Sequence, residues 1–122
     1  MKLGGMAAQV GNITFDCADA LRLATFWSAV LDRPVDPGGT EHWACIGGDP
    51  QWLFERVPER KQAKNRMHVD LVDPDPGAID RLVALGATVV AEHRLPWNDH
   101  SWTILQDPEG NEFCLAAERY SA

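Results

Sequence analysis

An internal repeat constrains the fold of this 122-residue chain more than any single motif does. Two segments, one beginning near Asn12 and the other near His68, carry the same landmarks in the same order. Two copies are too few for a solenoid, which needs at least about three repeats. The repeat therefore predicts a single domain over residues 1–122, made of two modules at about 9–57 and 65–118. The matched landmarks, 56 residues apart, are Asn12, Ile13, Phe15 and Asp19 in the first module and His68, Val69, Leu71 and Asp75 in the second.

Each module has the pattern of a strand, a helix and three further strands. Asp19 is a suitable N-cap for one helix, whereas Asp75-Pro76 begins a second helix that Gly86 ends. The predicted fold class is thus α+β, with two βαβββ modules in a pseudo-twofold repeat. The apolar helix positions are Leu23, Phe26, Trp27, Val30 and Leu31, then Ile79, Leu82 and Val83. The predicted strands are 11–17, 34–36, 42–47 and 52–57 in the first module and 66–72, 88–93, 101–106 and 112–118 in the second.

The charge balance and the cysteines limit the classes of partner. Eighteen acidic against eleven basic side chains give a net charge of −7, which disfavours nucleic acid because phosphate neutralisation needs a basic face. The one basic stretch, residues 60–66, is expected to be a solvated loop. The beginning of the chain lacks the apolar region of a secretory signal, and no apolar run is long enough to cross a membrane. Three widely spaced cysteines without a CxxC pair favour the reducing cytoplasm.

Alternation along the strands sorts the side chains into two faces. The face expected under the helices is apolar, with Ile13, Phe15, Cys17, Met67, Val69 and Leu71. The opposite face mixes polar and apolar groups: Asn12, Thr14, Asp16, Leu53, Glu55, Val57, His68, Asp70, Glu112, Cys114 and Ala116. A solvated sheet would explain each acidic residue singly, since Asp and Glu are rarely buried. The whole set favours sheets that curl into a cup-shaped, partly acidic cavity, with the helices on the outer face.

Four stretches of the sequence resemble the vicinal oxygen chelate superfamily, which includes the glyoxalase and bleomycin-resistance proteins and the glyoxalase-like domains. These stretches are NITFDCADALRLATFW, KNRMHVDL, LVALGATVVAEH and DPEGNEFCL, and together they cover most of residues 11–118. The resemblance implies two βαβββ modules whose sheets enclose a shared cavity. It also implies a homodimer, because a second copy often completes that cavity in the superfamily.

The resemblance further implies where a metal would be bound. Metal-dependent relatives such as glyoxalase I take one ligand from the first strand and one from the last strand of each module. Glu55 and His68 have the expected ligand types at two of these positions, whereas Asn12 replaces a His and Cys114 replaces a Glu. Because an amide is a poor donor to a transition metal, we expect no intact four-ligand site and assign no cofactor. The alternative is a divalent metal, Zn²⁺, Ni²⁺, Mn²⁺ or Fe²⁺, on His68 and Glu55, with Cys114 as third ligand or with Asp70 or Asp16 substituting.

Other residues are candidates for the cavity wall. Trp43 and Trp102 occupy equivalent strand positions and offer ring faces to a planar ligand, although paired tryptophans also fill cores. Residues 94–100 break the repeat and are expected at the rim, with His93 and His100 as second-choice general bases. For Cys114 the structural alternative is a small buried hydrophobe. For His68 it is a neutral imidazole bonded to Asp70 or Glu55.

Three functions remain open at this point. The first is a metal-independent small-molecule binding protein, lined by Asn12, Asp16, Asp70, Trp43, Trp102 and Cys114 and favouring cationic or hydrogen-bond-rich ligands. The second is a lyase, isomerase or dioxygenase that uses either a metal or acid–base catalysis by His68 and Glu55. The third is an interaction module whose cavity has no ligand. We prefer the first of these.

Overall fold

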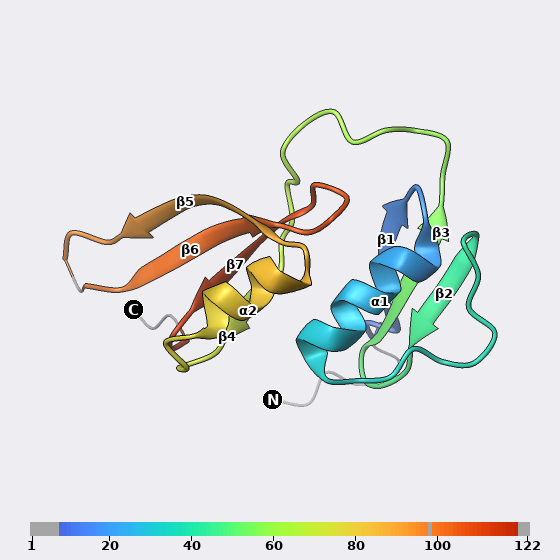
Figure 1. Ribbon diagram of the computed structural model, residues 1–122, viewed down its shortest axis with the longest axis horizontal. Coiled ribbons are helices and arrows are strands. Elements are labelled where there is room, and N and C mark those ends of the chain that lie inside the picture. The colour runs from blue at the N-terminus through green and yellow to red at the C-terminus, as the bar shows by residue number, and fades with distance from the viewer. Residues whose placement is uncertain (1–7, 98, 120–122) are drawn as a thin grey trace.

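The computed structural model describes residues 8–97 and 99–119, and it contains seven named strands and two helices (Figure 1). In the first module these are β1 (Asn12–Cys17), α1 (Ala20–Leu31), β2 (Trp43–Ile46) and β3 (Gln51–Arg56). In the second they are β4 (Asp70–Val72), α2 (Ala78–Leu85), β5 (Thr88–Arg94), β6 (Ser101–Gln106) and β7 (Glu112–Ala116). The expected domain and secretory-signal assignments include residues 1–7 and 120–122, which lie outside the described part.

The two modules build their sheets in the same way. The order is β1-β3-β2 in the first sheet and β4-β7-β6-β5 in the second, and in each the first strand runs parallel to the last. The predicted strand 34–36 is reduced to one bridge, between Val35 and Ile46. Pro34 and Pro37 flank that bridge, and proline cannot donate the hydrogen bonds that would extend it. The α+β fold of paired βαβββ modules is confirmed, with this one strand shortened.

The second module starts later than the sequence pattern predicts. Its first strand was expected over 66–72, but β4 begins at Asp70. The partner strand β7 begins only at Glu112, and the bond from Cys114 N to Val69 O, 3.0 Å long, marks the start of the pairing. Met67 consequently has no place in the sheet and is 88% exposed, contrary to the prediction that it lies under the helices.

The helix starts also change the register of the repeat. Asp19 is the N-cap of α1 as predicted, and its carboxylate accepts a 3.1 Å bond from Arg22 N. In the second module Asp75 instead forms a turn by accepting a bond from Gly77 N, and Gly77 is the N-cap of α2. The two N-caps are therefore separated by 58 residues rather than 56. This shift turns Val83, a predicted core position, outward.

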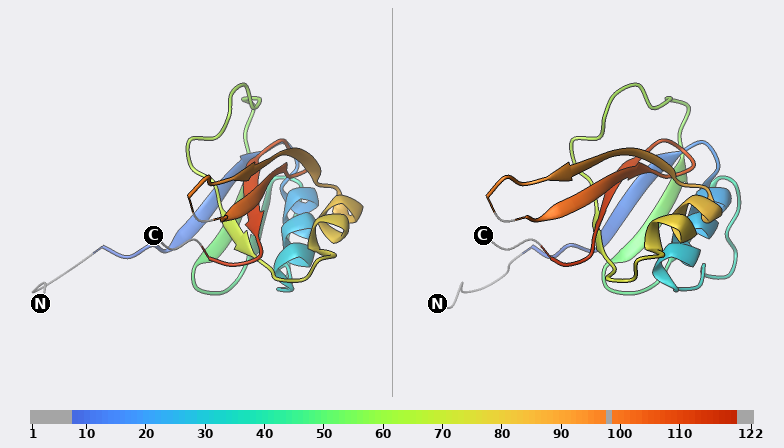
Figure 2. Two further views of the ribbon diagram at one scale, coloured as in Figure 1. Left: turned by 90° about the vertical axis from the view of Figure 1, so that its left-hand side faces the viewer. Right: turned by 60° about the vertical axis from the view of Figure 1, so that its left-hand side comes forward.

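A single apolar core lies beneath both helices. Its largest fully buried side chains are Trp27, Phe54, Phe113, Leu23, Ile46 and Leu105, which come from both modules. The rings of Trp27 in α1 and Phe113 in β7 lie 5.0 Å apart, so the first helix packs on the last strand of the other module. Figure 2 shows both helices on the same side of the strands. The opposite face of the sheets is left free for a binding site.

Candidate functional site

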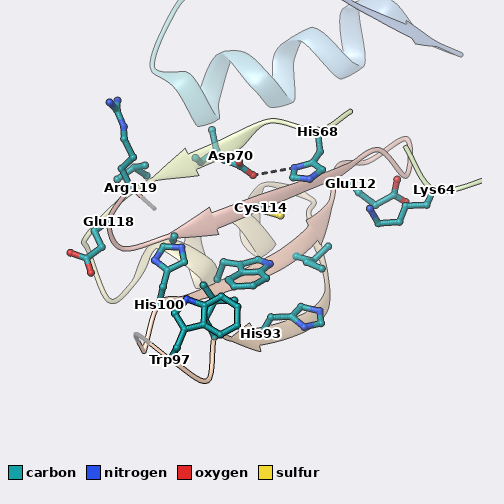
Figure 3. A pocket seen from close by; sticks show the side chains of 16 residues that line it. Lys64, His68, Asp70, His93, Trp97, His100, Glu112, Cys114, Glu118 and Arg119 are labelled. Atoms are coloured by element: carbon teal, nitrogen blue, oxygen red, sulfur yellow. Dashed lines mark ion pairs between the residues drawn. The ribbon is translucent and has the colours of Figure 1, made fainter. Parts of the chain in front are cut away.

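A cavity of about 820 Å³ opens on the free face of the second sheet (Figure 3). All of its lining residues fall between Lys64 and Arg119, so none comes from the first sheet. Three groups of side chains shape it. His68, Asp70 and Cys114 lie together, an aromatic wall rises from β5 and β6, and Lys64 and Glu112 lie at one end.

His68, Asp70 and Cys114 form the polar group of this cavity, and the local backbone explains why they meet. His68 and Asp70 are two residues apart in an extended segment, so their side chains share a face. The parallel pairing of β4 with β7 places Asp70 directly beside Cys114. His68 Nδ1 lies 3.1 Å from Asp70 Oδ1, and one potential ligand atom from each of the three residues lies within 4.8 Å of the others.

The electrostatics of this group make Cys114 a neutral thiol. Burial raises the pKa of Cys114, and the charge of Asp70 and a hydrogen bond to its carboxylate raise it further, whereas Lys64 has a smaller opposing effect. The Cys114 side chain is buried, whereas those of His68 and Asp70 are 37% and 71% exposed. Asp70 thus accepts from both neighbours. A proton on His68 Nδ1 leaves Nε2 as an acceptor, the tautomer that a general base requires.

The aromatic wall is built around Trp102. His93 lies opposite Trp102 in the β5–β6 register, and their rings stack with centroids 5.5 Å apart at 23°. The His100 ring stacks on the same indole at 5.8 Å and 29°. Trp97 lies at the exposed rim. Near-parallel rings of this kind provide a surface for a flat ligand.

The Glu112 end of the cavity is neutralised from within the chain. Lys61 Nζ lies 3.1 Å from Glu112 Oε1, and the backbone N–H of Asn65 donates to the same oxygen at 2.7 Å. Burial alone would raise the pKa of Glu112, but these bonds together outweigh it and lower the pKa to about 2. The basic stretch 60–66 is therefore not only a solvated loop, since Lys61 pairs with a buried carboxylate and Lys64 lines the cavity.

The structure separates the predicted site residues into two groups. His68, Asp70, Cys114 and Trp102 line the cavity together, as do Leu95, Trp97 and His100 of the predicted rim segment. The first-sheet candidates are not among its lining residues. Asn12 and Glu55 are exposed on β1 and β3, Asp16 lines a separate cavity, and Trp43 is 47% exposed on β2.

The sheet register also revises which residues correspond in the two modules. Asp16 pairs with Glu55 in the first sheet just as Asp70 pairs with Cys114 in the second. Two residues earlier, His68 then corresponds to Thr14 and not to Asn12. The cavity further contains Lys64, Glu118 and Arg119, which sequence reasoning did not select. No motif marks these three, because all lie in segments outside the named strands and helices.

The comparison with protein families decides the assignment. The model of the glyoxalase-like domain matches residues 12–116. The chain belongs to the glyoxalase-like family. This family lies in the vicinal oxygen chelate superfamily, as the sequence resemblance predicted. No curated protein matches this glyoxalase-like chain significantly.

Solved structures agree on the fold of the glyoxalase-like chain. A mutant fosfomycin resistance protein from Listeria monocytogenes, complexed with Mn(II) and 1S,2S-dihydroxypropylphosphonic acid, has a TM-score of 0.75 at 14% identity, with 93% of each chain covered. A glyoxalase/bleomycin resistance protein/dioxygenase family enzyme from Burkholderia phytofirmans has a TM-score of 0.66 at 18% identity, covering 88% of this chain and 97% of that one. Lactoylglutathione lyase from Agrobacterium tumefaciens has a TM-score of 0.59 at 16% identity, covering 90% and 93%. At these identities the similarity shows the fold.

Both described helices are too short or too polar to cross a membrane.

Proposed function

We propose that this chain binds a planar small organic molecule in the cavity of the second module. The observation that carries the proposal is the wall around Trp102, on which two imidazole rings already stack. A planar ligand can stack on the same kind of surface while its polar groups reach His68 and Asp70. This arrangement, an apolar surface with a few convergent polar groups, is typical of small-molecule sites.

The charges of the cavity favour a hydrogen-bond-rich ligand over a strongly cationic one. Glu112, which would have attracted a cation, is already paired with Lys61. Among the other lining residues, Asp70 and Glu118 are matched by Lys64 and Arg119. We therefore favour the hydrogen-bond-rich class among the two that the sequence suggested.

A thermal-shift screen tests this proposal. In the presence of a chelator, planar heterocyclic compounds should raise the melting temperature, because a ligand that binds only the native state stabilises it. Trp102→Ala should remove the shift. Trp43→Ala, a tryptophan in the equivalent strand of the first module, is the matched control and should keep it. If no compound stabilises the wild type, or if both variants respond alike, the proposal is wrong and an interaction module becomes the better reading.

A second candidate is a lyase, isomerase or dioxygenase that uses a divalent metal or acid–base catalysis. The grouping of His68, Asp70 and Cys114 favours it, because imidazole, carboxylate and thiolate are all zinc ligands. When bound, the metal would polarise oxygen atoms of a substrate. Protein purified without chelators should then contain stoichiometric Zn, Ni, Mn or Fe. If it contains none, and turnover is neither present nor restored by adding these ions, only the binding role survives.

The homodimer and the cytoplasmic location also stay predictions. The mass of the protein in solution, measured by light scattering at working concentration, tests the first. Fractionation of cells that express the protein tests the second.

A further inference from the structure

We propose that His68, Asp70 and Cys114 of the second module form a Zn²⁺ site by themselves, in which Asp70 supplies the carboxylate that the superfamily resemblance assigns to Glu55. The inference rests on the proposed function, because it concerns the same cavity. It differs from the superfamily pattern in taking every protein ligand from one module rather than from both.

The backbone places these three donors with little freedom. Asp70 and Cys114 are register partners on adjacent parallel strands, and Cys114 N also bonds to Val69 O at 3.0 Å. His68 precedes Asp70 by two residues and points to the same face, as Figure 3 shows. Glu55 lies on β3 of the other sheet and is not one of the residues lining this cavity. The carboxylate nearest to His68 and Cys114 is therefore that of Asp70.

The spacing of the donors is close to that of a tetrahedral zinc site. Zn–N and Zn–O bonds of about 2.0–2.2 Å and a Zn–S bond of about 2.3 Å put neighbouring ligand atoms about 3.3–3.6 Å apart. The 3.1 Å between His68 Nδ1 and Asp70 Oδ1 is already near this value. The three donor atoms lie within 4.8 Å of one another, so closure needs movements of at most about 1 Å. Asp70 is the most exposed of the three and can rotate at small cost.

The donor chemistry selects zinc rather than a harder cation. Thiolate ligands favour soft or borderline metals, whereas Mg²⁺, Ca²⁺ and Mn²⁺ prefer oxygen. One thiolate and one carboxylate also balance the charge of Zn²⁺, and a neutral imidazole adds none. With three protein ligands, the fourth position faces the cavity, as in catalytic zinc sites that hold water or substrate there.

Metal titration of the full chain tests the inference, with isothermal calorimetry for Zn²⁺ and absorption spectroscopy for Co²⁺. The wild type should bind one equivalent of Zn²⁺ per chain, and Co²⁺ should give a thiolate charge-transfer band. Asp70→Asn should weaken Zn²⁺ binding at least about tenfold, since loss of even an indirect partner of a metal costs about 10–100-fold. Glu55→Gln is the matched control and should change the affinity by less than about twofold.

Two cysteine variants complete the design. Cys114→Ser should abolish the charge-transfer band, and Cys45→Ser, a cysteine on the first sheet, should keep it. The inference is overturned if the wild type binds no metal, if Glu55→Gln weakens binding as much as Asp70→Asn, or if the band survives in Cys114→Ser. These titrations contain no organic ligand and the thermal-shift screen contains no metal. Either proposal can therefore fail while the other stands.

Discussion

The indole Nε1 of Trp27 donates a 3.0 Å hydrogen bond to the buried carboxylate of Asp107. This bond joins the helix of the first module to the turn before β7 in the second. The same carboxylate accepts bonds from Glu109 N, Asn111 N and the Asn111 amide. Every neighbour of Asp107 in this network is a donor, so the site requires an acceptor at both oxygens.

Asp107→Asn should destabilise the fold. Its amide group would turn an N–H₂ toward at least one of these donors, and a buried polar group left unsatisfied costs about 1–3 kcal/mol. Chemical denaturation measures the loss in unfolding free energy. Asp49→Asn is the matched control, because Asp49 precedes a proline at the equivalent turn of the first module but is exposed. The control should stay within about 0.5 kcal/mol of wild type. Equal losses in the two variants would show that the network does not join the modules.

Glu112 predicts an acid-dependent loss of stability. Its pKa falls from 4.5 to about 2 on folding, because the bonds from Asn65 N and Lys61 outweigh the effect of burial. A depressed folded pKa means that the unfolded chain binds the proton more tightly. The contribution of Glu112 is thus fully present above about pH 4.5 and is lost as the pH falls toward about 2.

Unfolding curves at several pH values test this dependence. The difference in unfolding free energy between wild type and Glu112→Gln should shrink as the pH decreases through that window. Lys61→Met removes one of the interactions that lower the pKa and should make the wild-type dependence shallower. A difference that stays constant across the window would contradict the assignment.

Cys17 should be almost inert in the folded protein. Burial raises the pKa of its thiol to about 12, with smaller contributions from Glu109, Asp16 and Asp19. Since only the thiolate reacts, a rise from 9.0 to about 12 lowers the reactive fraction about a thousandfold at neutral pH. In a Cys45→Ala/Cys114→Ala background, a thiol reagent should label Cys17 at least about a hundredfold more slowly in the native than in the denatured state. Equal rates would disprove the burial of this thiol.

Local sequence patterns predicted most of the fold. The stripe in α1, the cap at Asp19 and the turns around Gly86 and Asp107-Pro108 each depend on neighbouring residues, so a single sequence reveals them. The start of β4 does not have this property. Whether Met67 belongs to a strand depends on where β7 begins, more than 40 residues later in the chain. The 56-residue alignment of the modules failed for the same reason, because loop lengths hide the true sheet register.

The candidate site was only partly readable from the sequence. Strand alternation put His68, Asp70 and Cys114 on one face, but the adjacency of Asp70 to Cys114 is a property of the β4–β7 register. Glu112 likewise looked like an available acidic group, and its pairing with Lys61 bridges residues far apart in sequence. Alternation gives the side of a sheet on which a residue lies. It does not give its partners across strands.

The central claim is that the second-module cavity, with Trp102 in its wall, binds a planar ligand. The five tryptophans give five indole N–H signals in a nitrogen–proton correlation NMR spectrum, and each can be assigned with single Trp→Phe variants. On titration with a compound that stabilises the protein, the signals of Trp102 and Trp97 should shift with a common saturation curve while those of Trp43 and Trp52 stay in place. A ligand that shifts Trp43 and leaves Trp102 unchanged would contradict the account.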